Sequence, residues 1–466
     1  MVPKSLYLQR LEHISPNLKI GRKKSLFRNN LNKVKMTVKY NKINTNLFTL
    51  NRSKLCKELK HNSLAIFHSN DEMPRNGDCF FPFRQNSDLF YLSGIDQEHT
   101  ILIVFPDCPN PSYREVLFVR KTNEHIKIWE GHKYTKNEAT ETSGVKSVFW
   151  LENFDNIFKM LANWADNIYI NINENDRATS DVDSRNLRFA KNIKEQLPAH
   201  NFERAAPILT RLREIKSDLE IDIIKQSCVI TEKALRRVLG FVKPDVWEYE
   251  IEAEITHEFI RNRANGHAYT PIVASGANAC CLHYIDNNSQ CKEGELILMD
   301  FGAEYANYAS DLTRTIPVSG KFSPRQKEVY NSVLTVMKAA VKLLVVDNVL
   351  DSYHREVGKL MEEQLIKLGL LKADDVKKQD PQQPLYKKYF MHGTSHFMGL
   401  DVHDVGNRHK AFKPGMVFTC EPGIYIPEEN LGIRIENDYL ITKDGAVDLM
   451  ASIPIEINEI EALMKK

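Results

Sequence analysis

Short apolar runs separated by polar, helix-like segments mark the chain from about residue 47 to residue 207. Runs of four to eight residues that are rich in β-branched and aromatic side chains are typical of strands. The clearest runs span residues 63–69, 100–106, 115–121 and 167–172. Residues 180–197 instead repeat apolar side chains at helical spacing. This alternation predicts an α/β domain in the first half of the chain.

A different pattern begins after a boundary near residues 208–216. Ser217 and Glu220 have the spacing of a helix capping box, and apolar residues then recur at helical spacing as far as Gly240. Asp245 and Glu248 repeat this signal for a second helix that ends near residue 266. A third helix of some twenty residues is predicted from Ser323, with Gln326 at capping-box spacing, and a fourth ends near residue 369. With strand-like segments between the helix pairs, the pattern predicts a curved sheet backed by four helices. Residues 371–389 are polar, contain two prolines and read as a surface loop.

The stretch Leu296–Thr315 carries two aspartates in a strand-like context. Asp300 ends the apolar run LILMD, and Asp311 precedes the alternating segment LTRTIPV. A carboxylate at the end of a buried strand is costly unless a cation or hydrogen-bond donors compensate its charge. Each aspartate alone could equally cap a turn. Metal binding therefore depends on further ligands downstream.

Such ligands follow in three later motifs. MHGTSHFMGLDVHDVG, TCEPGIYI and LGIRIEND supply His392, His396, His403, Glu421, Arg434 and Glu436. Carboxylates with a single imidazole form an oxygen-rich donor set, which favours Mn²⁺, Fe²⁺ or Co²⁺ and leaves Zn²⁺ open. Five such ligands suit a two-metal centre with the ions ~3.5 Å apart.

Composition limits the classes of function. The 466 residues are 42% hydrophobic and 27% charged, as expected for globular domains with sizeable cores, and the net charge of +2 gives no reason to expect a nucleic-acid partner. No apolar run approaches ~18 residues, so we expect no membrane span. The eight cysteines have no CxxC spacing and suit a reducing compartment.

Residues 1–40 form a basic extension, with ten Lys or Arg residues against the single acid Glu12. This composition matches a mitochondrial transit peptide superficially. A disordered tail, or a start codon assigned too early with the true start at Met36, accounts for it equally. We expect a cytoplasmic protein, and a mitochondrial one if the basic extension is a transit peptide.

The four metal-ligand motifs together resemble the pita-bread metallopeptidases of family M24B, and among these the Xaa-Pro aminopeptidases (aminopeptidase P). The resemblance covers roughly residues 40–460. It implies a two-domain α/β chain, with an N-terminal domain of the creatinase/aminopeptidase P type over residues 41–210 and a pita-bread catalytic domain over residues 211–466. The segment Arg75–Asp96 resembles the part of that N-terminal domain that shapes the substrate entrance and the oligomer contact, although Arg84, Asp88 and Tyr91 could equally form a structural turn network.

The resemblance also implies roles for the ligands. Asp300 would chelate one metal, His396 would bind the other, and Asp311 and Glu436 would bridge the pair. Glu421 would complete the site and shuttle a proton. The implied cofactors are two divalent ions, with Mn²⁺ expected, which hold a bridging hydroxide that attacks the scissile carbonyl.

Further side chains have expected roles through the same resemblance. His283 and His403 match histidines that flank the metals and steady the tetrahedral intermediate, although each could be an ordinary core histidine. Arg434 would pair with a ligand carboxylate or a substrate group. His392 and Tyr425 could orient ligands without touching substrate.

The implied activity is removal of the residue before proline from peptides with proline at position 2. Glu421 and Glu436 are only fifteen positions apart, a spacing that resembles that of prolidases, so an Xaa-Pro dipeptidase is the main alternative. A non-catalytic peptidase-like binding module is a remote one. Relatives of this kind imply a homodimer or homotetramer.

Overall fold

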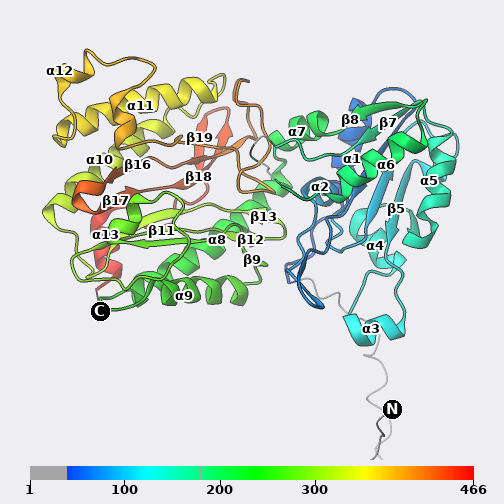
Figure 1. Ribbon diagram of the computed structural model, residues 1–466, viewed down its shortest axis with the longest axis horizontal. Coiled ribbons are helices and arrows are strands. Elements are labelled where there is room, and N and C mark those ends of the chain that lie inside the picture. The colour runs from blue at the N-terminus through cyan, green and yellow to red at the C-terminus, as the bar shows by residue number, and fades with distance from the viewer. Residues whose placement is uncertain (1–38, 176, 178–179, 466) are drawn as a thin grey trace, which may run out of the picture. The chain divides into compact units, whose positions relative to one another are not determined.

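The computed structural model describes residues 39–175, 177 and 180–465 (Figure 1). All but the last two residues of the basic extension lie outside this range, so the transit-peptide hypothesis is not tested. Residues from 38 onward cluster into one unit. Within it the α/β prediction is confirmed, because mixed sheets and helices make up both halves of the chain.

The N-terminal half is built on a six-stranded sheet in the order β6-β5-β4-β1-β7-β8. Its strands are β1 (Ser63–His68), β4 (Ile101–Val104), β5 (Glu115–Val119), β6 (Ser147–Trp150), β7 (Asn167–Ile170) and β8 (Asn201–Arg204). β1 is buried along its whole length and pairs antiparallel with β4 and parallel with β7. The four predicted strands are present. The four-residue strands β6 and β8 were not predicted.

Helices alternate with these strands along the chain and lead into its second half. They are α1 (Asn46–Glu58), α2 (Ser87–Ser93), α3 (Glu124–Glu130), α4 (Lys136–Ser143), α5 (Phe154–Ala162), α6 (Arg185–Gln196) and α7 (Ala206–Glu214). Apolar side chains of α5 and α6, such as Phe158 and Ile193, pack on sheet residues such as Ile66. The predicted boundary at residues 210 and 211 falls inside α7.

The C-terminal half contains the four predicted long helices. They are α8 (Asp218–Phe241), α9 (Glu248–Arg261), α10 (Pro324–Val341) and α11 (Leu350–Lys367). Two of the three predicted caps are present, because Ser217 with Glu220 and Ser323 with Gln326 form capping boxes. The prediction at Asp245 and Glu248 was wrong, since Trp247 is the N-cap of α9 and Glu250 is its capping-box partner. Figure 1 shows α8 and α9 below the strands of this half and α10 and α11 above them.

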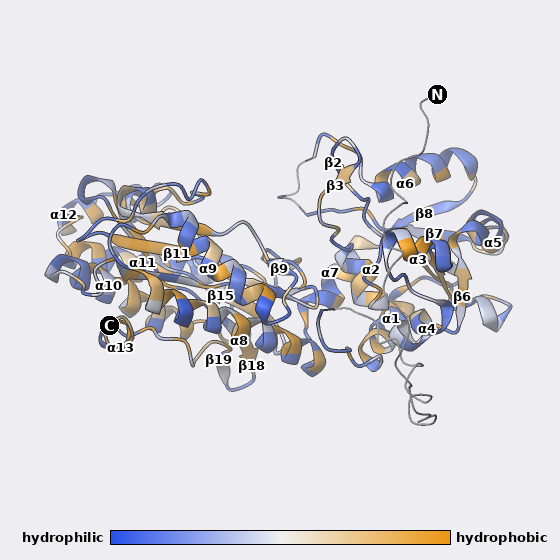
Figure 2. Ribbon diagram, turned by 90° about the horizontal axis from the view of Figure 1, so that it is seen from below, coloured by the Kyte–Doolittle hydropathy of each residue, from blue (hydrophilic) through white to orange (hydrophobic). Residues whose placement is uncertain are grey.

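The strands between these helices form several small sheets rather than one continuous sheet. Their members are β10 (Ile272–Ser275) with β11 (Leu296–Asp300) and β14 (Thr313–Pro317), β15 (Val417–Cys420) with β18 (Asn437–Thr442) and β19 (Gly445–Asp448), β16 (Gly423–Ile426) with β17 (Leu431–Arg434), and β9 (Gly266–His267) with β12 (Ala303–Tyr305) and β13 (Tyr308–Ala309). The first four residues of β11 are buried, and Figure 2 shows this strand in orange. The loop prediction for residues 371–389 was wrong in part, since α12 (Ala373–Val376) and a 3₁₀ turn lie within it.

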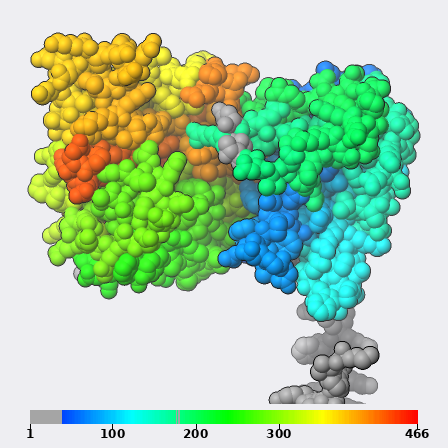
Figure 3. Space-filling view, viewed as in Figure 1, coloured from blue at the N-terminus to red at the C-terminus, as the bar shows by residue number. Residues whose placement is uncertain are grey.

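The segment around Arg84 joins the two halves. The Arg84 guanidinium donates to the Glu304 carboxylate (2.6 Å) and to the backbone oxygens of Asn307 (3.0 Å) and Leu400 (2.9 Å). The hydroxyl of Tyr91 donates to the backbone oxygen of Leu212 (3.3 Å). In Figure 3 the blue surface of this region meets the green surface of the C-terminal half. Arg84 thus connects the halves of the chain, and Tyr91 connects to α7, which leads from one half to the other, so both have structural roles.

We expect Gly302→Ala to lower the free energy of unfolding by about 3 kcal/mol, because a Cβ at this position would overlap the backbone oxygen of Ser310. Gly240→Ala is the matched control. Gly240 lies in α8 with open space around it, so an added methyl group should be neutral or stabilise by up to about 1 kcal/mol. Chemical denaturation of the two variants measures both values, and equal effects would contradict the packing at Gly302.

Candidate metal centre

The site contains four carboxylates in two pairs. The two members of each pair lie at adjacent ends of two antiparallel strands. Asp300 ends β11, and Asp311 lies two residues before β14, which pairs with β11. Glu421 follows β15 directly, and Glu436 precedes β18, which pairs with β15. The backbone N–H of Glu436 donates to the Thr313 carbonyl (3.1 Å) and so joins the two pairs.

The five predicted ligands come together. Asp311, His396 and Glu436 each offer a ligand atom, and these atoms all lie within 4.8 Å of one another. The Nε2 atom of His396 is 3.4 Å from Asp311 Oδ2 and 3.7 Å from Glu421 Oε1. Asp300 lies next to this cluster, because the hydroxyl of Tyr269 contacts a carboxylate oxygen of Asp300 and one of Asp311.

Burial makes this concentration of negative charge unfavourable without a cation. Burial, followed by the charge of Asp300, holds the pKa of Asp311 well above its usual range. Burial likewise raises the pKa of Glu436, and it raises that of Glu421 to about 7. Arg434 is the one guanidinium in contact with these carboxylates among the residues that the structure describes. The donor set, with four carboxylates and one imidazole, therefore fits divalent cations.

The side chain of Arg434 holds several of these groups in place. Its guanidinium donates to Asp300 Oδ2 (2.7 Å), to the hydroxyl of Tyr425 (2.9 Å) and to the hydroxyl of Thr313 (3.1 Å). Thr313 in turn donates to Glu436 Oε2 (2.6 Å). Of the two predicted partners for Arg434, the structure shows the ligand carboxylate, and every nitrogen of the guanidinium is engaged with the protein.

The four histidines of the site have three kinds of surroundings: one faces the carboxylates, one is bound to a tyrosine hydroxyl, and two line the cavity. His396 directs Nδ1 to the carbonyl oxygen of Phe397 (3.0 Å), which leaves Nε2 to face the carboxylates. His392 contacts the hydroxyl of Tyr425 (2.8 Å), and burial lowers its pKa to about 3, so it is neutral at physiological pH. The ring centroid of His403 lies 4.3 Å from that of His396. His283 and His403 both line the cavity above the carboxylates.

Sequence reasoning missed three side chains that hold the ligands. The hydroxyl shared by Asp300 and Asp311 belongs to Tyr269, which donates to Asp300 Oδ1 (2.6 Å) and to Asp311 Oδ1. The Asp438 carboxylate accepts from the backbone N–H of Asp311 (3.0 Å), and Thr313 orients Glu436 as described. Thr313 begins β14 two residues after Asp311, and this spacing in a strand-like segment was the one available signal.

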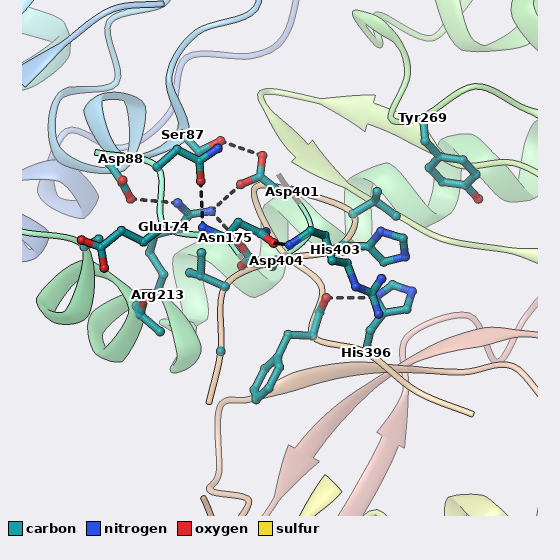
Figure 4. Close-up of a pocket in the computed structure, with 18 of the residues that line it drawn as sticks. Ser87, Asp88, Glu174, Asn175, Arg213, Tyr269, His396, Asp401, His403 and Asp404 are labelled. Carbon is teal, nitrogen blue, oxygen red and sulfur yellow. Dashed lines mark hydrogen bonds and ion pairs between the residues drawn. The ribbon is translucent and has the colours of Figure 1, made fainter. Parts of the chain in front are cut away.

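The carboxylates lie at the wall of a cavity of about 1880 Å³. Both halves of the chain line it. The N-terminal half contributes Phe81, Arg84 and Asp88, and the C-terminal half contributes the five predicted ligands with His283 and His403. Figure 4 shows His403 and His396 side by side, with Tyr269 across the site. A cavity of this size accommodates several residues of a peptide.

Comparison with known proteins decides the family. The profile of metallopeptidase family M24 matches residues 222–443, and that of the aminopeptidase P N-terminal domain matches residues 48–169. The chain is 35% identical to the Xaa-Pro aminopeptidase of Escherichia coli over 90% of its own length and 97% of that protein. The chain belongs to the M24 metallopeptidases of the aminopeptidase P type.

Solved structures of M24 metallopeptidases agree over most of the chain. Aminopeptidase PepP of Pseudomonas aeruginosa superposes with a TM-score of 0.83 at 31% identity, over 91% of this chain and 98% of that one. Aminopeptidase P of E. coli with the inhibitor Pro-Leu gives 0.82 at 33% identity, over 91% and 99%. The predicted two-domain pita-bread architecture is thereby confirmed. In the part of the chain that the structure describes, no helix is both long and apolar enough to cross a bilayer.

We expect the metal-free M24 protein to lose stability as the pH rises from about 4.5 to 7. Glu421 titrates near pH 7 in the folded state but near its ordinary value of 4.5 in the unfolded chain, so the folded state alone retains the proton in this window. A shift of that size corresponds to roughly 3 kcal/mol, all of it present below pH 4.5 and lost as the pH rises through 7. Thermal unfolding across this range measures the effect.

Glu421→Gln should reduce this pH dependence, because the amide cannot ionise, whereas Asp311 and Glu436, whose pKa values burial also raises, still contribute to it. Glu293→Gln is the control, since Glu293 is exposed and lies outside the cavity. A divalent ion should also reduce the loss of stability at pH 7. If the Glu421→Gln variant and the parent protein responded identically to pH, the buried-carboxyl interpretation would be wrong.

Proposed function

We propose that this chain is a metal-dependent Xaa-Pro aminopeptidase that hydrolyses the bond before proline at the N-terminus of peptides. The observation that carries the proposal is the convergence of four carboxylates, two buried and two partly buried, with His396 at the wall of a large cavity lined by both halves of the chain. Membership of the M24 family and the similarity to E. coli Xaa-Pro aminopeptidase support it.

The proposed ligands of two divalent ions are Asp300, Asp311, His396, Glu421 and Glu436. We propose Mn²⁺ as the native ion, which the oxygen-rich donor set supports. When bound, the ions would polarise the scissile carbonyl and lower the pKa of the attacking water. Arg434 and Tyr269 keep Asp300 oriented toward the ions, through 2.7 Å and 2.6 Å contacts.

Proton transfer is assigned to Glu421. Its carboxylate accepts a proton from the attacking water and delivers it to the proline nitrogen, as the water oxygen bonds to the carbonyl carbon and the C–N bond breaks. Its position supports this role, because its oxygens lie 3.7 Å from both His396 Nε2 and His392 Nδ1 at the cavity surface. His283 and His403 would donate to the carbonyl oxygen as it gains negative charge.

The size of the cavity favours an aminopeptidase over a dipeptidase. The short segment between Glu421 and Glu436 folds as the hairpin β16–β17 with a turn at Pro427–Glu429, and the cavity remains about 1880 Å³. A dipeptide would fill only a small part of this volume. Substrates longer than two residues are therefore expected.

Two further proposals concern the state of the enzyme in the cell. Each of the eight cysteines lies within the described residues and is a free thiol, which supports a reducing compartment such as the cytoplasm or the mitochondrial matrix. A homodimer or homotetramer is supported by large apolar side chains exposed on the N-terminal half, including Phe80, Phe81, Ile128 and Trp129.

Purified protein loaded with Mn²⁺ should cleave Ala-Pro-Ala and longer Xaa-Pro peptides at the Xaa-Pro bond, with kcat/KM at least about tenfold above that for Ala-Pro. Ala-Ala-Ala is the control for proline specificity. Product analysis by mass spectrometry identifies the bond that is cut. Cleavage of the dipeptide alone would make the enzyme a prolidase, and no cleavage with metal bound would refute peptidase function.

Asp311→Asn and His396→Ala should each lower kcat/KM by about 10³-fold or more while the protein remains folded, since each removes a ligand from the cluster. Asp374→Asn is the matched control, because Asp374 is an exposed carboxylate on α12. Elemental analysis should show reduced metal content in the two ligand variants and parent content in the control. Full activity in either ligand variant would overturn the assignment.

A further inference from the structure

One buried arginine joins three carboxylates beside the site. Arg213 lies near the end of α7, and its side chain is 4% exposed. Its Nη1 donates to Asp88 (2.8 Å), and its Nη2 contacts both Asp401 (2.8 Å) and Asp404. Figure 4 shows this cluster next to His403. None of these four charged groups belongs to the proposed metal ligands.

Two of the three carboxylates flank His403 in the sequence. Asp401 precedes it by two residues and Asp404 follows it directly. Asp404 is also bound by Lys216 (3.1 Å), and Asp401 accepts from the hydroxyl of Ser87 (2.7 Å). The backbone around His403 is therefore fixed at both ends by side chains from other parts of the chain.

Close packing at Gly399 also constrains this segment. A Cβ on Gly399 would overlap Asp404 Oδ2, so the residue must be glycine for the carboxylate to reach Lys216 and Arg213. The backbone N–H of Asp404 donates to the carbonyl oxygen of Phe397 (2.9 Å), next to His396. The segment 399–404 is thus a tight loop whose geometry depends on ion pairs to two buried cations, Arg213 and Lys216.

Such a cluster is a costly way to obtain stability alone. Buried charges lose hydration, and well-packed apolar groups of similar volume are often at least as stabilising. What the cluster does supply is a fixed direction for each carboxylate. That matters at His403, because its ring lies 4.3 Å from His396, and displacement of a catalytic group by about 1 Å can cost about 100-fold in rate.

We propose that Arg213 is a positioning residue for His403, holding Asp401 and Asp404 on either side of it. The role rests on the proposed peptidase function, in which His403 contacts the scissile carbonyl. Because Arg213 also binds Asp88, and Ser87 binds Asp401, the N-terminal half of the chain takes part in placing this histidine.

Lysine at this position tests the geometry without removing the charge. A guanidinium presents several N–H donors in a planar fork, whereas an ammonium on a shorter stem cannot reach three carboxylates in fixed directions. Arg213→Lys should lower kcat for Ala-Pro-Ala about tenfold and leave KM within about twofold, because His403 acts on charge that develops in the transition state.

A double-mutant cycle separates positioning from general damage. In a His403→Ala background, Arg213→Lys should change kcat by less than about twofold, since the residue that it positions is gone. Metal content should stay at the parent level in all four proteins. If Arg213→Lys lowered kcat by the same factor with and without His403, the proposal would be overturned.

Arg52→Lys is the matched control. Arg52 is also fully buried, and it bonds to the backbone oxygens of Leu92 (2.7 Å) and Ser143 (2.9 Å) away from the site. Arg52→Lys should lower the thermal midpoint without lowering kcat of the folded protein.

If Arg213→Lys does not fold, Asp401→Asn takes its place in the cycle, because the Asp401 carboxylate is 46% exposed. Asp401→Asn should lower kcat about threefold when His403 is present.

Hydrogen exchange provides a readout that needs no activity. Arg213→Lys should speed exchange of the amides of Gly399 and Asp404 about tenfold, and Arg52→Lys should not. Unchanged exchange would overturn the proposal even if the parent protein cleaves Xaa-Pro peptides. Conversely, if the metal-loaded parent cleaves none, the proposed function fails while exchange still shows whether Arg213 holds the loop.

Discussion

The catalytic half of the structure is built around four carboxylates, two buried and two partly buried, that repel one another unless a cation lies between them. Asp311, Glu421 and Glu436 all have raised pKa values, with burial as the largest cause. A single guanidinium, that of Arg434, contacts the group within the described residues, and it contacts only Asp300 directly. Such an arrangement is stable when divalent cations neutralise it, and the surrounding donors serve to keep each carboxylate turned inward.

Much of this site could be predicted from local sequence, because each ligand lies in a short motif next to a strand. The sequence motifs and the family resemblance together predicted the five ligands. Residue spacing alone predicted the capping boxes at Ser217 and Ser323. Tyr269 could not be predicted in this way. It belongs to a separate segment, and only the folded chain brings its hydroxyl to Asp300. Arg213 was missed for the same reason, since its carboxylate partners lie at positions 88, 401 and 404.

The misses in secondary structure have similar causes. β6 and β8 are four residues each and only partly buried, so neither shows the long buried run that identified β1, and β8 (NFER) contains a single apolar residue. The polar composition of residues 371–389 hid α12, whose four residues are too few to display a helical repeat. Long elements with a buried face were predictable, whereas short exposed ones were not.

The pairing of the ligands has a consequence for how the protein folds. Asp300 and Asp311 come from one strand pair, and Glu421 and Glu436 come from another more than a hundred residues later. Neither pair alone offers the complete donor set, and the backbone contact between Glu436 and Thr313 joins the two. Closing so long a loop is slow and entropically costly, so the complete site forms late in folding. A nascent chain that has not yet formed its last strands therefore lacks the complete donor set. Metal binding to all five residues is then a late step of folding.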